Sequence, residues 1–446
     1  MNEHAIQSIQ GFQHQAASLL LYQSVLSGEI GQAFLNVLET LRYSDSSASC
    51  LRAYGDWFIT LATHHQSWQD YLLSQILLAD NPFTQQAQQL EFNSVSLALT
   101  AAARHDLRVL QRLYACSSQQ ISQWVQAIAE LSTAPVFWEE QTSAAFPHEV
   151  DELRDLPIWK KLAASKDWGN ELEELAAYYY QAGVGIFGKF RAFRWQSGEL
   201  VGIPYPDPIQ LQHLVGYELQ RDALIKNTEA LLAGYTALHV LLYGSRGSGK
   251  SSLVKALLHE YGDRGLRLIE VSKSDLRDLV TITDELRDLP QKFILFVDDL
   301  SFEEDEDAYK ALKVLLEGNL TARPQNIVVY ATSNRRHLIR EFFGDRPRPS
   351  DADEVHAWDT VQEKLSFSDR FGLTLTFEPA NQDTYLAIVR HLATQSDLAI
   401  EPQDLDYRAL QWATRHNGRS GRTARQFIDF LRAELEMMGN TRPKPQ

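Results

Sequence analysis

The sequence predicts an α/β fold, in which a parallel sheet with flanking helices and a small C-terminal helical lid follows an all-helical N-terminal domain. Three observations predict it. Up to residue 197, apolar residues recur at three- and four-residue spacing, which is typical of amphipathic helices. Over residues 213–380, continuously apolar runs such as "HVLLYG" and "KFILFVDD" alternate with helical stretches, as in a parallel sheet covered on both faces. Over residues 381–446 the pattern is helical only, which predicts the lid and a C-terminal tail.

Length and composition restrict the class of protein. A chain of 446 residues is long enough for two or three domains. Its net charge of −16 disfavours broad binding to nucleic acid, although local basic stretches leave nucleic acid open as a partner. Two cysteines are too few for a disulfide framework. Because the sequence has no signal-peptide pattern and no apolar run of about 20 residues, we expect a cytoplasmic protein without a membrane span.

The N-terminal domain, residues 1–197, is acidic and rich in tryptophan. Among the first 200 residues, 12 are Lys or Arg and 21 are Asp or Glu. The tryptophans have two interpretations: they form the aromatic core of a helical bundle, or they bind another protein. The acidity favours an unidentified protein partner with a basic face. Seven of the nine tryptophans lie here: Trp57, Trp68, Trp124, Trp138, Trp159, Trp168 and Trp195.

A linker is predicted over residues 198–212. It contains Pro204, Pro206 and Pro208, and each proline keeps the residue before it extended. The domain with the sheet is therefore expected to begin at residue 213 and to end at residue 380.

The most specific motif lies where an apolar strand gives way to a helix. The segment "GSRGSGKS" fits the phosphate-loop pattern G-x-x-x-x-G-K-[ST]. Glycines let the loop turn its N–H groups inward, Lys250 is expected to reach the β- and γ-phosphates, and Ser251 to bind Mg²⁺. The alternative, a glycine-rich turn that matches by chance, is disfavoured by the strand before it and the helix after it. The predicted phosphate-binding residues are Gly244, Ser245, Arg246, Gly247, Ser248, Gly249, Lys250, Ser251 and Ser252.

Two later strand ends supply polar side chains of the kind that such a site needs. "FILFVDD" ends in Asp298, expected to hold the Mg²⁺ shell, and Asp299, expected to orient the attacking water. The alternative is an acidic strand end that begins a solvated run. "VVYATSN" ends in Asn334, which could contact the γ-phosphate or the water, or could serve only to form a turn.

These motifs, in this order, resemble those of an AAA+ ATPase over about residues 205–437. More narrowly, "LLYGSRGSGKSSLVKALL" and "FILFVDDLSFEE" resemble a bacterial group within AAA+ known only as a domain of unknown function. The resemblance implies ATP and Mg²⁺ as cofactors and an ATP-dependent oligomer. It implies that Asp299 and Asn334 are catalytic, that Arg370 in "SDRFG" is an arginine finger, and that Arg422 is the lid sensor. Arg425 is the alternative lid sensor, and Val215, Gly216 and Tyr217 would line the adenine pocket.

The sequence also departs from the family pattern. Asp at position 299 replaces the usual Glu, whose longer side chain positions the water, so slow hydrolysis is expected. No aromatic pore loop of the threading machines is present, and an insertion at 344–368 separates Asn334 from Arg370. We therefore expect a switch or remodelling ATPase that acts on a protein. The alternatives are a DNA-transaction ATPase, such as a helicase loader or transposition helper, and a scaffold that binds nucleotide without hydrolysis.

Overall fold

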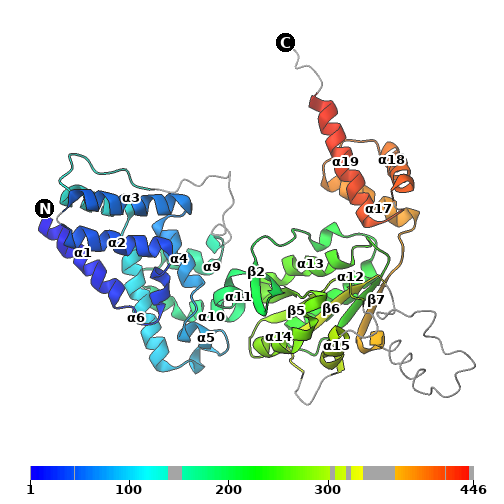
Figure 1. Cartoon of the computed structure of the whole chain (residues 1–446), viewed down its shortest axis with the longest axis horizontal. Helices are drawn as coiled ribbons and strands as arrows, with labels where there is room; N and C mark the ends of the chain where they lie inside the picture. Colours follow the sequence, from blue (N-terminus) through cyan, green and yellow to red (C-terminus); the bar gives the residue numbers. More distant parts are fainter. Residues whose placement is uncertain are drawn as a thin grey trace, which may run out of the picture. The chain divides into compact units, whose positions relative to one another are not determined.

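The computed structural model describes residues 2–44, 46–138, 153–301, 307–317, 323–334, 367–416 and 418–440 (Figure 1). The chain divides into two compact units, residues 1–189 and residues 190–446. In the described residues, no helix is long and apolar enough to cross a bilayer.

The first unit is helical throughout its described residues. Ser46, Ser67 and Ser117 each accept a hydrogen bond from a backbone N–H of the helix that follows, which fixes where three of the helices begin. The helices are α1 (Asn2–Ala17), α2 (Glu29–Tyr43), α3 (Ser47–Thr63), α4 (Trp68–Leu77), α5 (Pro82–Ala87), α6 (Leu97–Tyr114), α7 (Ser118–Ile128), α9 (Pro157–Ala164), α10 (Leu172–Ala182) and α11 (Gly185–Lys189).

The tryptophans of this unit belong to its core. Trp68 and Trp168 are fully buried, and the Trp68 ring stacks on Phe34 with centroids 4.0 Å apart. The interpretation of the tryptophans as anchors for a partner is therefore wrong for the five that are buried, because a buried side chain cannot contact another protein. These five are Trp57, Trp68, Trp124, Trp159 and Trp168.

The second unit contains a seven-stranded, mostly parallel sheet. Its strand order is β2-β1-β4-β5-β6-β3-β7, so β3 lies between β6 and β7, and β5 lies on the other side of β6. The strands are β1 (Ala192–Gln196), β2 (Glu199–Ile203), β3 (Val240–Gly244), β4 (Leu266–Glu270), β5 (Lys292–Val297), β6 (Ile327–Ser333) and β7 (Leu373–Phe377). Residues on β5 and β6 are almost all buried, as the continuously apolar runs predict.

The sheet begins earlier in the chain than the sequence predicts. Residues 192–203, assigned to the end of the helical domain and the start of the linker, form an antiparallel β1–β2 hairpin. Strand β1 pairs in parallel with β4. Its Trp195 is buried, and the indole N–H donates to Asp278 Oδ2 at 2.9 Å. This tryptophan therefore belongs to the second unit. The predicted linker, residues 198–212, begins too early, because residues up to Ile203 belong to β2.

Helices cover both faces of the sheet, and Figure 1 shows α12 and α13 on one face and α14 and α15 on the other. The bounds are α12 (Glu218–Leu232), α13 (Lys250–Tyr261), α14 (Leu279–Leu286) and α15 (Asp307–Glu317). The lid consists of α17 (Gln382–Gln395), α18 (Pro402–Arg415) and α19 (Gly421–Asn440), which share an apolar core of their own. The predicted fold class is thus confirmed, including the helical region before the sheet.

Candidate functional site

The glycine-rich loop connects the end of β3 to the start of α13. Gly244, Gly247 and Gly249 have φ angles of 140°, 73° and 92°, a region that favours glycine. A Cβ on Gly244 would lie 1.9 Å from the carbonyl oxygen of Phe377, because β7 passes directly beside the loop. The loop conformation predicted from the motif therefore depends on glycines at defined positions.

Lys250 is the first residue of α13 and extends back across the loop. Its Nζ donates to the carbonyl oxygens of Gly244 at 3.1 Å and Ser245 at 2.8 Å. Burial lowers the pKa of Lys250, while the charges of Asp298 and Asp299 act in the opposite direction. The ammonium group is thus held in the loop by neutral carbonyls and is available to an anion.

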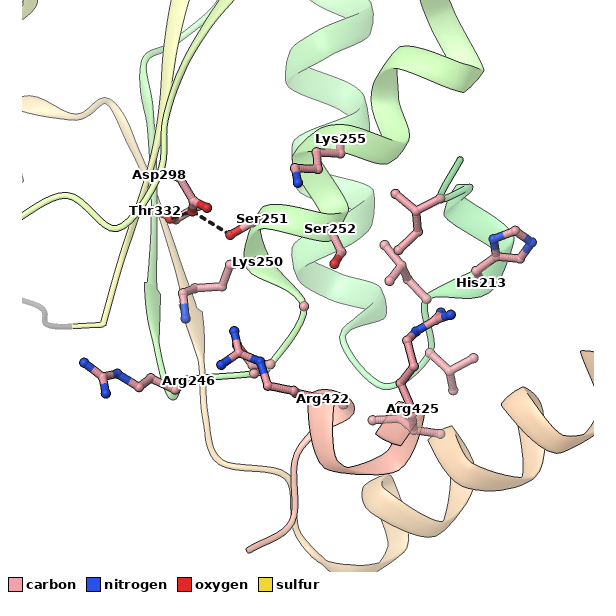
Figure 2. Close-up of a pocket in the computed structure, with 18 of the residues that line it drawn as sticks. His213, Arg246, Lys250, Ser251, Ser252, Lys255, Asp298, Thr332, Arg422 and Arg425 are labelled. Atoms are coloured by element: carbon pink, nitrogen blue, oxygen red, sulfur yellow. Dashed lines mark hydrogen bonds between the residues drawn. The ribbon is translucent and has the colours of Figure 1, made fainter. Parts of the chain in front are cut away.

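Ser251, Asp298 and Thr332 form a hydrogen-bonded group beside the loop. Ser251 Oγ donates to Asp298 Oδ1 at 2.6 Å, and Thr332 Oγ1 donates to the same oxygen at 2.5 Å (Figure 2). Thr332 also accepts from the backbone N–H of Asp299 at 3.0 Å. Sequence reasoning missed Thr332. Its position near the end of β6, two residues before Asn334, was the signal that could have found it.

Asp299 and Asn334 meet at the ends of β5 and β6. Asn334 Nδ2 donates to Asp299 Oδ1 at 2.6 Å, and Lys250 Nζ lies 3.5 Å from Asn334 Oδ1. Asp299 has a φ of 52°, which few non-glycine residues adopt and Asp tolerates better than most. The structure therefore brings the two predicted acids, the predicted Asn and the loop lysine together.

The lid closes over the loop from the other side. The backbone N–H of Arg422 donates to the carbonyl oxygen of Gly247 at 3.2 Å. A Cβ on Gly247 would lie 2.9 Å from Ser420 Oγ and 3.1 Å from Arg422 Cβ, so the lid packs tightly there. Loop, sheet edge and lid enclose a pocket of about 620 Å³ (Figure 2).

The far end of the pocket has apolar walls. Val215 lines it, together with Ile209, Leu214, Ile388 and Leu392, and with His213. Sequence reasoning missed the last five, because their approach depends on how the lid meets the segment before α12.

Gly216 and Tyr217 are not among the lining residues. The Tyr217 hydroxyl donates to the carbonyl oxygen of Glu378 at 2.7 Å, and its ring packs on Phe377. Gly216 lies against Thr384 of the lid. These two residues therefore position the segment rather than form the pocket surface.

Other predicted residues fall in different places. Arg246, Ser248, Gly249 and Ser252 line the pocket. Arg370 does not line the pocket of its own chain; it ends a short 3₁₀ helix (Phe367–Arg370) before β7. Nearly all of the 344–368 insertion, residues 344–366, lies outside the described residues.

The pocket has an excess of positive charge although the chain is acidic. Its lining includes two carboxylates, Asp298 and Asp299. Lys255 lies 3.6 Å from Asp207, a residue outside the lining. Such a local reversal of sign attracts an anionic ligand. The cationic side chains of the lining are Arg246, Lys250, Lys255, Arg422 and Arg425.

The oxygen atoms at the loop suit Mg²⁺. Ser251 Oγ and Asp298 Oδ1 are hard ligands, and Mg²⁺ usually takes one or two protein oxygens, together with waters and substrate phosphates. Among the described residues, no cluster of three or more His, Cys, Asp or Glu side chains could hold a metal by itself. The donor set therefore fits Mg²⁺ that arrives with a phosphate ligand.

Comparison with known proteins adds a family and several structures. The family described as "Protein of unknown function (DUF815)" matches residues 188–435. The RuvB Holliday junction branch migration motor of Thermotoga maritima has 16% identity and a TM-score of 0.31, and the match covers 50% of this chain and 72% of that chain. AMPPCP-bound DnaA of Aquifex aeolicus has 19% identity and a TM-score of 0.34, with 50% and 66% covered. The replication initiator DnaA bound to AMPPCP and single-stranded DNA has 19% identity and a TM-score of 0.35, with 53% and 70% covered. No curated protein matches the chain.

Proposed function

The chain belongs to the family described as Protein of unknown function (DUF815), and on this premise we propose that it is an AAA+ protein that binds and hydrolyses ATP. The observation that supports this most directly is the loop between β3 and α13. Gly247, Gly249, Lys250 and Ser251 of this loop line one pocket, together with Asp298 and Asp299 after β5. The excess of cations in that pocket is the charge that a triphosphate requires.

In this proposal, the loop binds the triphosphate. The N–H groups of the loop and of the first turn of α13 face the phosphates, and the Lys250 ammonium exchanges its two carbonyl partners for phosphate oxygens. Ser251 and Asp298 would hold Mg²⁺, which neutralises charge on the β- and γ-phosphates. Thr332 keeps the Asp298 carboxylate oriented toward Ser251.

Hydrolysis is assigned to Asp299 and Asn334. Asp299 accepts a proton from water as the water oxygen bonds to the γ-phosphorus and the bond to the β–γ bridging oxygen breaks. ADP and inorganic phosphate leave. Asn334 donates to the Asp299 carboxylate at 2.6 Å, so it orients this carboxylate and must yield when Asp299 turns to the water.

Two arginines complete the proposed site. The backbone N–H of Arg422 makes the lid contact at Gly247, and its side chain lines the pocket, where it would reach the phosphates. Arg370 lines no part of the pocket of its own chain, which suits a residue that reaches the nucleotide of a neighbouring copy. The proposal therefore includes ATP-dependent self-association, with an arginine that stabilises transition-state charge in the neighbour.

We further propose that the ATPase cycle acts on a protein partner through the first unit. The support is its charge: residues 1–189 have 10 Lys and Arg against 20 Asp and Glu, which favours a partner with a basic face. The buried tryptophans contribute nothing to this argument, so it rests on charge alone.

The binding step is tested with Lys250→Ala. We expect this variant to lose ATP affinity by at least about 100-fold with an unchanged melting temperature, because a charge-assisted contact to phosphate is lost. Lys226→Ala on α12, an exposed lysine outside the pocket, is the matched control and should bind like the wild type. Isothermal calorimetry and thermal unfolding measure the two quantities. Equal ATP affinity in a folded Lys250→Ala protein refutes the assignment.

The hydrolysis step is tested with Asp299→Asn. We expect ATP affinity to stay within a few-fold of the wild type and kcat to fall by about 10²–10⁴-fold, the usual contribution of a general base. Phosphate release at saturating ATP and Mg²⁺ measures kcat. If wild type and variant both bind ATP and neither releases phosphate, the chain binds nucleotide without hydrolysis.

A further inference from the structure

Two arginines of the lid helix α19 face different ends of the pocket. Arg422 and Arg425 are one helical turn apart, about 4.5 Å along the axis, and both line the pocket. Figure 2 shows the Arg422 side chain directed toward Lys250 and the Arg425 side chain directed toward His213. Helix α19 thus presents the guanidinium group of Arg422 to the phosphate loop and that of Arg425 to the apolar end of the pocket.

His213 presents a donor at the same end. Its Nδ1 accepts from the backbone N–H of Gln210 at 3.1 Å, so the neutral ring carries its proton on Nε2. In the part of the chain that the structure describes, no side chain or carbonyl accepts from this Nε2. The ring is half-buried and lines the pocket, and its position is fixed by the Gln210 contact.

Arg425 and His213 therefore offer only donors to a ligand. Around them Figure 2 draws side chains of carbon alone, and the lining residues without a polar side-chain atom are Ile209, Leu214, Val215, Ile388 and Leu392. Arg has no acceptor atom, and His213 uses its acceptor on Gln210. A ligand group that matches this end is flat and apolar on its faces and has acceptor atoms at its edge.

We propose that His213 and Arg425 bind the nucleoside part of the nucleotide, an inference that rests on the proposed function of the pocket. A purine base fits between the apolar walls and offers ring nitrogens to the two donors. The ribose oxygens offer the same acceptor chemistry. Arg425 is then a nucleoside-binding residue and not a second candidate for the lid sensor, and α19 binds both ends of one ligand.

The test compares ligands with and without the nucleoside. The probes are ATP, ribose 5-triphosphate and inorganic tripolyphosphate, each with Mg²⁺, on the full chain. We expect Arg425→Ala to weaken ATP by about 10- to 100-fold, the value of a hydrogen bond to a charged group, and to leave tripolyphosphate within two-fold. Arg422→Ala should weaken all three probes. Arg432→Ala, on the same helix but paired with Glu436 outside the pocket, is the matched control and should change none.

A second variant tests the same part of the pocket without changing Arg425. His213→Asn keeps an acceptor for the Gln210 N–H and removes the Nε2 donor, so it should weaken ATP and spare tripolyphosphate. A loss that persists with ribose 5-triphosphate assigns the contact to the ribose, and a loss seen with ATP alone assigns it to the base.

The inference is overturned if Arg425→Ala weakens ATP and tripolyphosphate equally, or weakens neither, while the wild type binds ATP. If the wild type binds neither ATP nor tripolyphosphate, the proposed function of the pocket fails as well, so the two failures are distinguishable.

Discussion

At the scale of single residues, His239 shows how burial sets the charge of a side chain at the end of β3 opposite to the phosphate loop. It immediately precedes β3 and is 4% exposed. Its Nδ1 accepts from the backbone N–H of Val329 on β6 at 2.9 Å, and Nε2 is buried without a hydrogen-bond partner among the described residues. Burial, with the charge of Arg323 as a smaller cause, lowers the pKa of His239 to about 3. The folded protein therefore keeps this ring neutral in mild acid.

This pKa predicts a pH-dependent stability. Below its ordinary pKa near 6.5, His239 gains a proton in the unfolded chain but not in the folded one. Stability is then complete above pH 6.5 and falls as the pH falls toward 3, by about 1.4 kcal/mol per pH unit from this residue. His239→Asn, whose amide oxygen can accept from Val329, should remove this part of the slope.

Urea unfolding between pH 7 and pH 4 measures the slope. His259→Asn is the control, because His259 bonds the carbonyl oxygen of Asp207 from an exposed position. Equal slopes for His239→Asn and the wild type would show that His239 is protonated in the folded state.

Residues of the site could be predicted from the sequence where their chemistry is local. Lys250, Ser251 and Asp298 meet within one pocket, because a strand, a loop and a helix in sequence place the first two and the next acidic strand end places the third. The sequence did not predict where Thr332, His213 and Arg425 lie in the pocket, because the position of each side chain depends on how separate elements pack. The prediction that Tyr217 lines the pocket was wrong. Its ring packs on Phe377 instead, and the sequence does not indicate this contact because the two residues are far apart in the chain.

At the scale of elements, the phosphate loop depends on the close approach of β3 and β7. Ser245 N–H donates to the Phe377 carbonyl oxygen at 3.0 Å, and the same oxygen would lie 1.9 Å from a Cβ on Gly244. Gly244 is therefore needed for the packing of β3 against β7 as well as for the loop conformation, because a side chain there would push β7 away.

Gly244→Ala should destabilise the protein by at least about 3 kcal/mol, since it adds a backbone clash to an unfavourable φ. Gly234→Ala is the matched control: φ is 79°, and nothing lies within 4 Å of its Cβ position, so only the φ cost of about 1–2 kcal/mol applies. Chemical denaturation measures both. Equal costs at the two positions would mean that β7 can shift freely.

The strands of the parallel sheet could be predicted from apolar runs, but the β1–β2 hairpin could not. "AFRWQ" and "ELVGI" mix charged and apolar residues, because a hairpin at a sheet edge is buried in part only. Their turn, Ser197 and Gly198, has positive φ at both residues, as the type I′ turn of a two-residue hairpin requires. The Ser-Gly pair was the sequence signal for this turn. The prolines that follow it led to the prediction of a linker over the same residues.

At the scale of the whole molecule, the position of this hairpin decides where the second unit can be separated from the first. The boundary follows Lys189, so β1 and its buried Phe193 and Trp195 belong with the sheet. A chain that begins at Phe190 retains every strand, whereas one that begins at Ser197 lacks β1, which leaves β2 without its partner and exposes the edge of β4.

We therefore expect residues 190–446 to fold and to bind ATP with an affinity close to that of the full chain. Residues 197–446 should be less stable by several kcal/mol, because the loss of two buried aromatic side chains alone costs about 3–5 kcal/mol each, and the free β4 edge should promote aggregation. Urea unfolding, light scattering and ATP titration compare the two chains. Equal stability would mean that β1 contributes nothing to the sheet. Failure of both chains to fold, while the full chain does, would mean that the first unit stabilises the second, and that its role is not recognition alone.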